Sequence, residues 1–254
     1  MTAPATKPQA APAALALADD ALVLAQRLGE WAGHAPVLEE DVALANIALD
    51  LLGQARVLYT LLGDEDELAY LREERAFRNA QLVEQPNGDF AHTIARQLYF
   101  STYHHLLHTQ LATTPAPDAA TEDTTAPDIR ALAAKAAKET AYHREHAELW
   151  TLRLGDGTPE SHHRMQRAID TLWRYTGELF QDLDGLQLDL HTLESNWHTA
   201  ITDTLTQATL TVPESPRTSA WTAGAGRQGL HTETFGRMLA EMQHLHRSHP
   251  GASW

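Results

Sequence analysis

Residues 38–62 read LEEDVALANIALDLLGQARVLYTLL, and the spacing of this run predicts one long α-helix. Apolar side chains such as Leu44, Ile47 and Leu51 cover most of its faces. Gly63 follows the run and suits the first position after a helix end. A helix of 25 residues is roughly 38 Å long. This length suits a bundle whose helices span a whole domain.

The same helical spacing continues on both sides of this run. Asp89 is placed to cap a helix after the turn at 85–88, and Pro159 occupies a position suited to the first residue of another helix. No alternation long enough for a β-strand is visible. We therefore expect an all-α fold, an antiparallel helical bundle without strands. The other expected helices cover 17–31, 66–79, 89–109, 128–154, 159–180, 193–210 and 232–248.

Two segments lack the helical pattern. Residues 1–14 are rich in Ala, Pro and Thr, with no long apolar core, so we expect a disordered leader rather than a signal peptide. Residues 113–127 hold three Pro, four Ala and no large apolar side chain. We interpret them as a solvated linker within a single domain, 15–254, because the helical pattern then resumes unchanged. Apolar runs such as 13–18 are much shorter than the ~20 residues of a transmembrane helix, so we expect a cytoplasmic protein.

The composition excludes several classes of function. Nineteen Lys and Arg stand against 34 Asp and Glu, which gives a formal charge of −15. Such a chain repels DNA phosphates and anionic lipid, so neither nucleic-acid nor membrane binding is expected. The absence of Cys excludes thiol nucleophiles, disulfides, iron–sulfur clusters and thiolate metal sites. The soft metal ligands that remain are 15 His.

Long helices that carry many Glu and His raise the hypothesis of a carboxylate-bridged di-iron site. Such a site needs a Glu from each of two helices and a Glu-x-x-His pair from each of two others. Chance gives about two acid-x-x-His pairs in a chain of this composition. Three occur, each at or near a predicted helix end: Asp89/His92, Glu160/His163 and Glu241/His244. The count therefore does not favour a di-iron site.

The middle of the two longest predicted helices lacks the motif as well. Asp50 is followed at the third position by Gly53, and Glu139 by Tyr142 and then His143. Neither helix therefore supplies the carboxylate–imidazole pair that a di-iron site needs, and we expect no bound metal here.

Glu139, His143 and His146 share one helical stripe and form the most metal-like cluster of the sequence. One interpretation is a mononuclear iron site on these three side chains. The interpretation that we favour is a buried carboxylate–imidazole pair, hydrogen-bonded because neither group can be left unpaired.

Two further clusters are weaker candidates. His104, His105 and His108 stand on a helix rich in aromatic residues, where ordinary packing and surface positions are the commoner explanation.

A concentration of positive charge is formed by Arg72, Arg75 and Arg78, with Phe77 and Asn79 beside them. In so acidic a chain this cluster could bind a phosphate or a partner's carboxylates, and Arg75, Phe77, Arg78 and Asn79 are the candidate contact residues. The alternative is an exposed helix with pairs such as Glu74–Arg78.

Several segments resemble the C subunits of the multicomponent phenylacetyl-CoA epoxidases, which oxidise the aromatic ring of a CoA thioester. The resemblance covers 20–254, and the departures lie in the leader and in the linker, where families tolerate variation. The matching segments are 26–31 (QRLGEW), 33–36 (GHAP), 44–56 (LANIALDLLGQAR), 82–88 (LVEQPNG), 172–176 (LWRYT), 229–233 (GLHTE), 238–243 (MLAEMQ) and Trp254.

This resemblance implies a ferritin-like bundle with extra helices and a non-catalytic role. In that family the A subunit holds the di-iron centre, and the C subunit pairs with A and keeps it structurally competent. Electrons come from a reductase subunit that uses FAD, a 2Fe-2S cluster and NADPH. The resemblance thus implies no cofactor, no catalytic residue and no activity of this chain alone. It also implies that Asp50, Gly53, Glu139, Tyr142 and His143 are a degenerate metal site. Other epoxidase subunits are implied partners, and the CoA ester is a possible contact of Arg75, Phe77, Arg78 and Asn79.

Two other classes of function stay open at this point. One is a ferritin-like oxygenase or oxidase subunit with its own iron at Glu139, His143 and His146. The other is a free-standing helical protein without a partner, which would expose no apolar patch of interface size.

Overall fold

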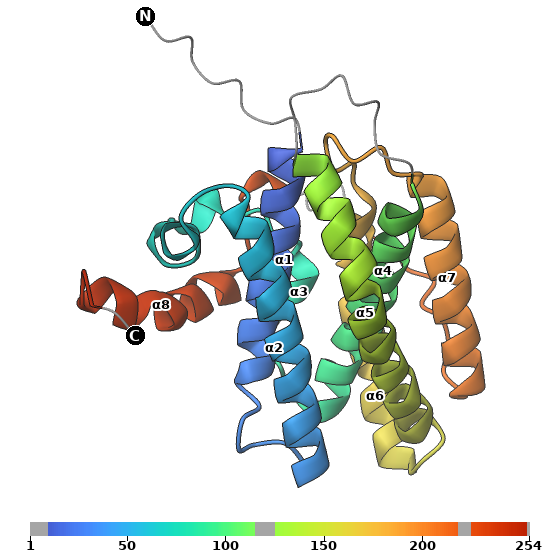
Figure 1. Cartoon of the computed structure of the whole chain (residues 1–254). Helices are drawn as coiled ribbons and strands as arrows, with labels where there is room; N and C mark the ends of the chain where they lie inside the picture. The colour runs from blue at the N-terminus through green and yellow to red at the C-terminus, as the bar shows by residue number, and fades with distance from the viewer. Residues whose placement is uncertain (1–9, 115–124, 218–224, 253–254) are drawn as a thin grey trace, which may run out of the picture.

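The computed structural model describes residues 10–114, 125–217 and 225–252, and every regular element within them is a helix or helical turn (Figure 1). The all-α, ferritin-like fold expected from the sequence is confirmed. In the central bundle α1 packs along α2, and α4 packs along α5. Its four helices are α1 (Ala11–Gly29), α2 (Leu38–Thr60), α4 (Phe90–Thr113) and α5 (Thr125–Gly155).

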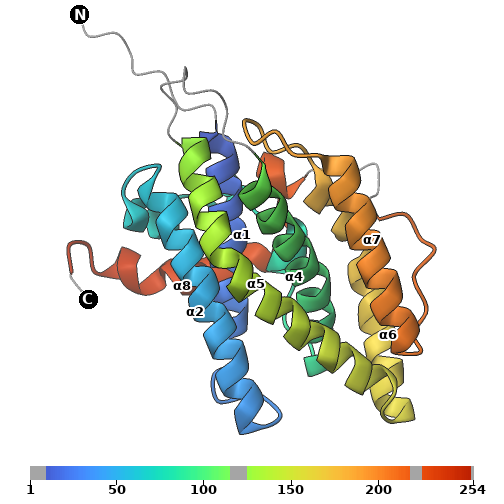
Figure 2. The ribbon, with the colours of Figure 1, turned by 45° about the vertical axis from the view of Figure 1, so that its right-hand side comes forward.

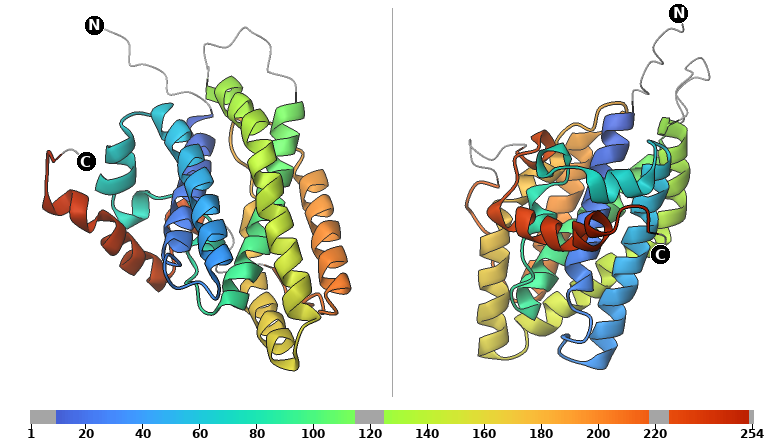
Figure 3. Two further views of the ribbon diagram at one scale, coloured as in Figure 1. Left: turned by 60° about the horizontal axis from the view of Figure 1, so that its bottom comes forward. Right: turned by 90° about the vertical axis from the view of Figure 1, so that its left-hand side faces the viewer.

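Further helices surround this bundle. α6 (Pro159–Trp173) and α7 (Leu190–Gln207) pack against α4 and α5 on one side (Figure 2). On the other side α8 (Glu233–Ser248) lies across the bundle and packs on two short turns, Glu67–Leu71 and Glu74–Ala76 (Figure 3). The remaining short elements are α3 (Gln81–Glu84) and the 3-10 turns Thr176–Phe180 and Gly226–Gln228.

Aromatic side chains join α4, α6 and α7. Trp197 is fully buried, and its indole N–H donates to the carbonyl oxygen of Tyr99 at 2.9 Å. The ring of Tyr99 lies 5.7 Å from those of Trp173 and Trp197, centroid to centroid. Buried aromatic pairs of this kind stabilise a core beyond the area that they remove from water.

Two helix starts agree with the sequence prediction. The carboxylate of Asp89 accepts the N–H of His92 at 2.9 Å and caps α4. Pro159 lies in the first turn of α6, where Thr158 and Ser161 form a reciprocal capping box. The end of α6 differs from the prediction, because the helix stops at Trp173 and a separate 3-10 turn covers Thr176–Phe180.

Helix α1 begins inside the predicted leader 1–14, and helix α5 begins inside the predicted linker 113–127. Residues 1–9 and 115–124 lie outside the described residues. α1 begins at Ala11, however, and Ala13 and Ala14 are buried in the core. Alanine is the strongest helix former, and Pro12 in the first turn lacks only an N–H that has no helical acceptor there. On either side of 115–124, α4 reaches Thr113 and α5 begins at Thr125.

The helix predicted over 66–79 is wrong. A π-helical turn covers Glu67–Leu71, a 3-10 turn covers Glu74–Ala76, and the backbone is extended at Phe77 and Ala80. The reason lies in the buried carboxylates described below, which accept backbone N–H groups of this segment in place of helical carbonyls.

Candidate functional site

The seam between α2 and α5 contains most of the predicted degenerate metal site. Nε2 of His143 donates to Oδ2 of Asp50 at 3.0 Å. One helical turn further along, Nε2 of His146 donates to Oε2 of Glu40 at 2.8 Å. Glu139 accepts a hydrogen bond of 2.9 Å from the amide of Gln54. Each of these three α5 side chains is therefore bound to a different side chain of α2.

The five predicted residues do not form one cluster. His143 is buried, and burial lowers its pKa although Asp50 acts in the opposite direction. The side chain of Asp50 is 38% exposed, and Tyr142 is 47% exposed. Gly53 lies on the outer face of α2, and a Cβ built on it meets nothing within 4 Å. The structure thus places Asp50, Gly53 and Tyr142 at the outside of the seam rather than in the bundle core.

The arrangement does not fit the alternative iron site either. Glu139 and His146 are seven residues apart on α5, which separates them by about 10 Å along the helix axis. Together with His143 they point to three successive partners on α2, so they do not converge on one ion. Across residues 10–114, 125–217 and 225–252, no group of three or more His, Asp or Glu side chains is arranged to hold a metal. These residues therefore do not fit a di-iron centre.

Two neutral imidazoles of α4 lie deeper in the bundle. The rings of His104 and His108 are 4.2 Å apart, centroid to centroid, and both side chains are buried. Burial, with smaller effects from neighbouring His105 and His143, lowers the pKa of His108 to about 3. The pKa of His104 lies well below its ordinary value for the same reason. The sequence favours ordinary packing or surface positions for these residues, and the structure places both in the core.

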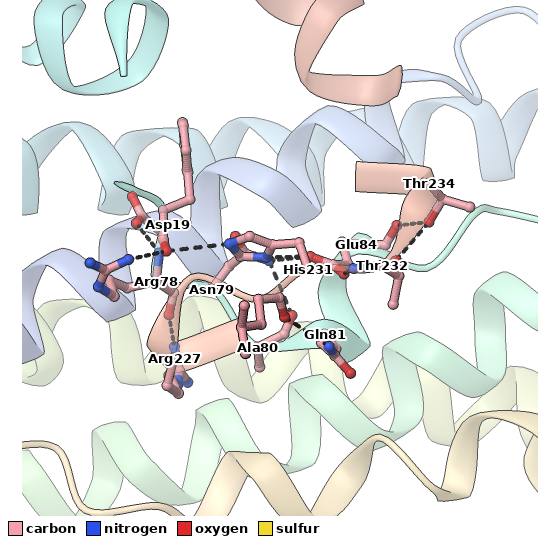
Figure 4. Close-up of polar contacts among 12 residues, drawn as sticks. Asp19, Arg78, Asn79, Ala80, Gln81, Glu84, Arg227, His231, Thr232 and Thr234 are labelled. Carbon is pink, nitrogen blue, oxygen red and sulfur yellow. Dashed lines mark hydrogen bonds and ion pairs between the residues drawn. The ribbon is translucent and has the colours of Figure 1, made fainter. Parts of the chain in front are cut away.

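Buried carboxylates of α1 hold the irregular segment that follows α2 (Figure 4). Asp19 is fully buried and accepts hydrogen bonds from the hydroxyl of Tyr59, the guanidinium of Arg72 and the backbone N–H of Arg78. Its four lone-pair positions are thus largely occupied by donors of this chain.

Asp20 and Glu178 hold the same segment from two other directions. Asp20 accepts the N–H of Ala80 at 2.7 Å and pairs with the guanidinium of Arg227 at 2.7 Å. Glu178 accepts the N–H groups of Gln81 at 2.8 Å and of Arg227 at 2.9 Å. Burial raises the pKa of both carboxyl groups, and Arg227 offsets this only in part.

Glu84 closes this buried network at the start of α8. Its carboxylate accepts from the amide of Asn79 at 3.0 Å, from Nδ1 of His231 at 2.8 Å and from the N–H of Thr232. Its backbone oxygen accepts from Arg27 at 2.8 Å. These bonds fix Glu84, in the segment 82–88 that resembles the epoxidase C subunits, to α1 and to the chain before α8. Figure 4 shows Glu84 beside His231, Thr232 and Thr234.

A glycine is required where the 3-10 turn Gly226–Gln228 meets this network. A Cβ on Gly226 would collide with the carbonyl oxygen of Asn79 and would come within 3.0 Å of Oε1 of Glu178. The turn can therefore approach the segment closely enough for the N–H of Arg227 to reach Glu178 only because no side chain intervenes.

The four residues of the predicted contact cluster differ in how far they are buried. Phe77 and Asn79 are fully buried, so their side chains are not available to a partner or a phosphate, which corrects the prediction for these two residues. Arg75 is exposed. Arg78 is half-buried and donates to the carbonyl oxygens of Arg75 and Phe77, at 2.8 and 2.7 Å. It also lines a hollow of about 720 Å³ beside the first turns of α1.

The chain matches known proteins along its whole length. The family model described as "Phenylacetic acid catabolic protein" (PaaA_PaaC) matches residues 1–254. The chain is 47% identical to a protein of Escherichia coli strain K12 that is named as the C subunit of 1,2-phenylacetyl-CoA epoxidase. That alignment covers 94% of this chain and 97% of the relative. The resemblance found in the sequence segments is confirmed, and this chain belongs to the phenylacetic acid catabolic protein family.

Proposed function

We propose that this chain is the C subunit of a phenylacetyl-CoA epoxidase and acts there as a structural, metal-free subunit that pairs with the di-iron A subunit. The identity of 47% to the C subunit of the E. coli enzyme, over nearly the full length of both chains, supports the assignment to this enzyme. The structural role rests on the side-chain pairing inside the bundle.

The structural role is supported by one observation: the buried acids are hydrogen-bonded to groups of the same chain. In the seam between α2 and α5, Glu40, Asp50 and Glu139 are each bound to a side chain of the other helix. Two carboxylates of α1 and one before α7 are bound to guanidinium or backbone N–H groups of the same chain: Asp19, Asp20 and Glu178. A di-iron site needs four carboxylates and two imidazoles that are free to bind metal. This chain stabilises its own acids without a metal.

Acids that are paired within one subunit can help a neighbouring catalytic subunit in a heteromeric oxygenase. A catalytic bundle must hold several carboxylates in its core, and without metal these unpaired charges each cost several kcal/mol. A neighbour whose acids are already paired can supply a rigid wall beside that bundle. In this proposal O2 activation belongs to the A subunit, and electrons arrive from the reductase with FAD, 2Fe-2S and NADPH.

The test is reconstitution of the complex with the variant Glu139→Gln. The substitution removes one carboxylate of the alternative iron site but leaves an amide beside Gln54. We expect pairing with the A subunit, iron content and epoxidation rate all to match the wild type. Loss of iron and a fall in rate of about tenfold or more, which is 1.4 kcal/mol or more, would show that this chain contributes to a metal site.

We also propose that exposed Arg75 contacts the A subunit or the phosphates of the CoA ester. The charge-reversed variant Arg75→Glu should weaken one of these two interactions, and Arg237→Glu on the exposed face of α8 serves as the control. If complex formation and CoA-ester affinity are both unchanged by Arg75→Glu, this contact does not exist.

A further inference from the structure

Exposed apolar side chains gather on the outer face of α2 and the adjoining edge of α5. Leu38 is 75% exposed, Leu49 64% and Val42 52%. On α5, Tyr142 and Leu149 are also about half exposed. α2 has the composition and length of a membrane-spanning helix, with a mean hydropathy of 1.2 over its most apolar window, of which only 39% is buried. The helix therefore has an apolar face beyond the one that the bundle core uses.

The two faces of α2 are opposite one another. Ile47, Leu51 and Leu58 point into the core and are almost completely buried. The exposed residues Leu38, Val42, Leu49 and Leu52 follow one another at spacings of four, seven and three, which places them on a single stripe. α2 and α5 contact each other and lie together at the front of the bundle in Figure 2. The stripe and the edge of α5 thus form one surface, which we name the α2 face.

Gly53 is a second, independent feature of the α2 face. It lies in the interior of α2, where glycine lowers helix stability relative to alanine. Its φ is not positive, and a Cβ on it would meet nothing within 4 Å. Neither the backbone nor the packing of this chain therefore requires a glycine here. A glycine with open space above it allows a backbone outside this chain to approach closely.

We propose that the α2 face is the surface on which the A subunit docks, with one of the helices of that partner lying across α2 at Gly53. This inference rests on the proposed pairing with A and adds the place of contact. The name of the matching family model, PaaA_PaaC, joins the A and C types, and we infer from it that the partner is a related helical bundle with helices of the same kind. The relative in E. coli is itself named as one subunit of a larger enzyme.

The size and charge of the α2 face agree with such a partner. α2 has 23 residues and is therefore about 34 Å long. Two neighbouring helices of that length, each about 10 Å wide, present an area on the order of 700 Å², close to the ~800 Å² per partner of a stable interface. Between Val42 and Ala55 the single acidic residue of α2 is Asp50, which is already bound to His143. The rim of the face is acidic, with Glu39 and Asp41 beside Leu38 and Glu145 beside Tyr142, so a partner that carries basic side chains around an apolar centre would complement it.

Two other occupants are less compatible with these observations. A bilayer would require α2 to leave the bundle, but Glu40, Asp50 and Gln54 hydrogen-bond it to α5. The formal charge of −15 also repels anionic lipid. Two copies of this chain would each carry a formal charge of −15 and would repel one another.

The experiment uses two variants of the α2 face and one matched control. Leu49→Glu places a charge in the stripe, and Gly53→Gln fills the open space with a good helix former. Leu245→Glu makes the same exchange on α8, at a leucine that is 52% exposed. Titration of each purified chain with the A subunit gives its affinity, and urea unfolding of each chain alone gives its stability.

We expect Leu49→Glu and Gly53→Gln to weaken binding of the A subunit by about tenfold or more, which corresponds to 1.4 kcal/mol or more, while Leu245→Glu binds normally. Gly53→Gln alone should be at least as stable as the wild type, which separates docking from folding. Normal binding by both α2 variants would overturn the docking surface but leave the proposed function intact. A wild-type chain that does not bind A would overturn the proposed function. If the wild-type chain alone forms a dimer and Leu49→Glu is monomeric, a second copy occupies this face and the proposal is overturned.

Discussion

Asp20 and Arg227 form a buried ion pair at 2.7 Å, and this pair connects α1 to the chain before α8. Both side chains are almost completely buried, at 2% and 8% exposure. A buried pair is weak evidence of net stabilisation, but removing one partner leaves an uncompensated charge in the core. The network around Asn79 and Glu84 therefore tolerates little change at single residues.

The prediction at this site concerns Asp20→Asn. We expect the free energy of unfolding, measured in urea, to fall by about 3–5 kcal/mol because buried Arg227 loses the carboxylate to which its guanidinium is hydrogen-bonded. Glu233→Gln is the matched control, since it breaks an exposed pair with Arg237 whose side chains are 86% and 79% exposed. Its effect should be small. Equal losses of unfolding free energy in the two variants would show that the buried pair contributes no more than the exposed one.

The buried imidazole of His108 makes the stability of the chain depend on pH in the acid range. The pKa of His108 is about 3 in the folded chain, against about 6.5 in an unfolded one, so below pH 6.5 the unfolded state binds more protons. Stability from this residue is present above pH 6.5 and is lost as the pH falls towards 3. Between pH 7.5 and pH 5 the loss amounts to about 2 kcal/mol. Asp20 and Glu178, whose pKa values are raised, act in the opposite direction.

The variant His108→Leu isolates this contribution. Between pH 7.5 and pH 5, the free energy of unfolding of this variant should fall by about 2 kcal/mol less than that of the wild type. Exposed His163 on α6 provides the control His163→Leu, which should follow the wild type. A parallel loss in His108→Leu and wild type would mean that this imidazole is not held neutral.

Single residues were predictable where their partners are local in the chain. Asp89 and Pro159 cap helices through neighbours within three residues, and both signals were visible. The pairing of Glu40 with His146 was missed because it joins positions 106 residues apart. A signal did exist, since Glu40 and Gln54 are fourteen residues, or about four turns, apart and so share the face of α2 that meets α5.

At the scale of elements, helices with their own periodic apolar face were predicted, and the segment after α2 was not. Residues 66–79 have helical composition, yet Arg78 and Ala80 donate their N–H groups to Asp19 and Asp20. These acceptors lie about 60 residues earlier in the chain. Tertiary contacts of this range override local propensity, and one sequence does not display them.

α8 and the turn Glu67–Leu71 form an element that we expect to open locally. Arg247 of α8 donates to the carbonyl oxygens of Tyr70, Leu71 and Arg72 and pairs with Glu73 at 3.0 Å. These bonds are exposed to solvent, which is typical of regions with low local stability.

We therefore predict that Arg247→Gln speeds amide hydrogen exchange of residues 67–76, while the urea midpoint of the whole chain changes little. The variant Arg237→Gln, on the same helix, should leave exchange of this segment unchanged. Unaltered exchange in Arg247→Gln would show that other contacts hold this turn.

Helix α2 gives a further prediction at the scale of elements. Gly53→Ala should raise the free energy of unfolding of the isolated chain by up to about 1 kcal/mol, because alanine favours the helix and nothing in this chain obstructs its Cβ. Thermal or urea unfolding measures it. Destabilisation by this variant would mean that the fold itself requires the glycine, and that the glycine is no guide to a docking surface.

At the scale of the whole molecule, the structure combines a core whose acids are paired internally with an apolar outer face. In the proposed function, the first property removes the need for a metal inside this chain, and the second offers a surface to a partner. This combination is the one that a structural subunit needs.

Elemental analysis of the chain, purified alone and without a metal-binding tag, decides whether it is a metal-free structural subunit. The paired side chains of the seam between α2 and α5 predict iron far below one atom per chain, with a folded, soluble product. Stoichiometric iron that is lost in Glu139→Gln would contradict the claim and make this chain a site of catalysis.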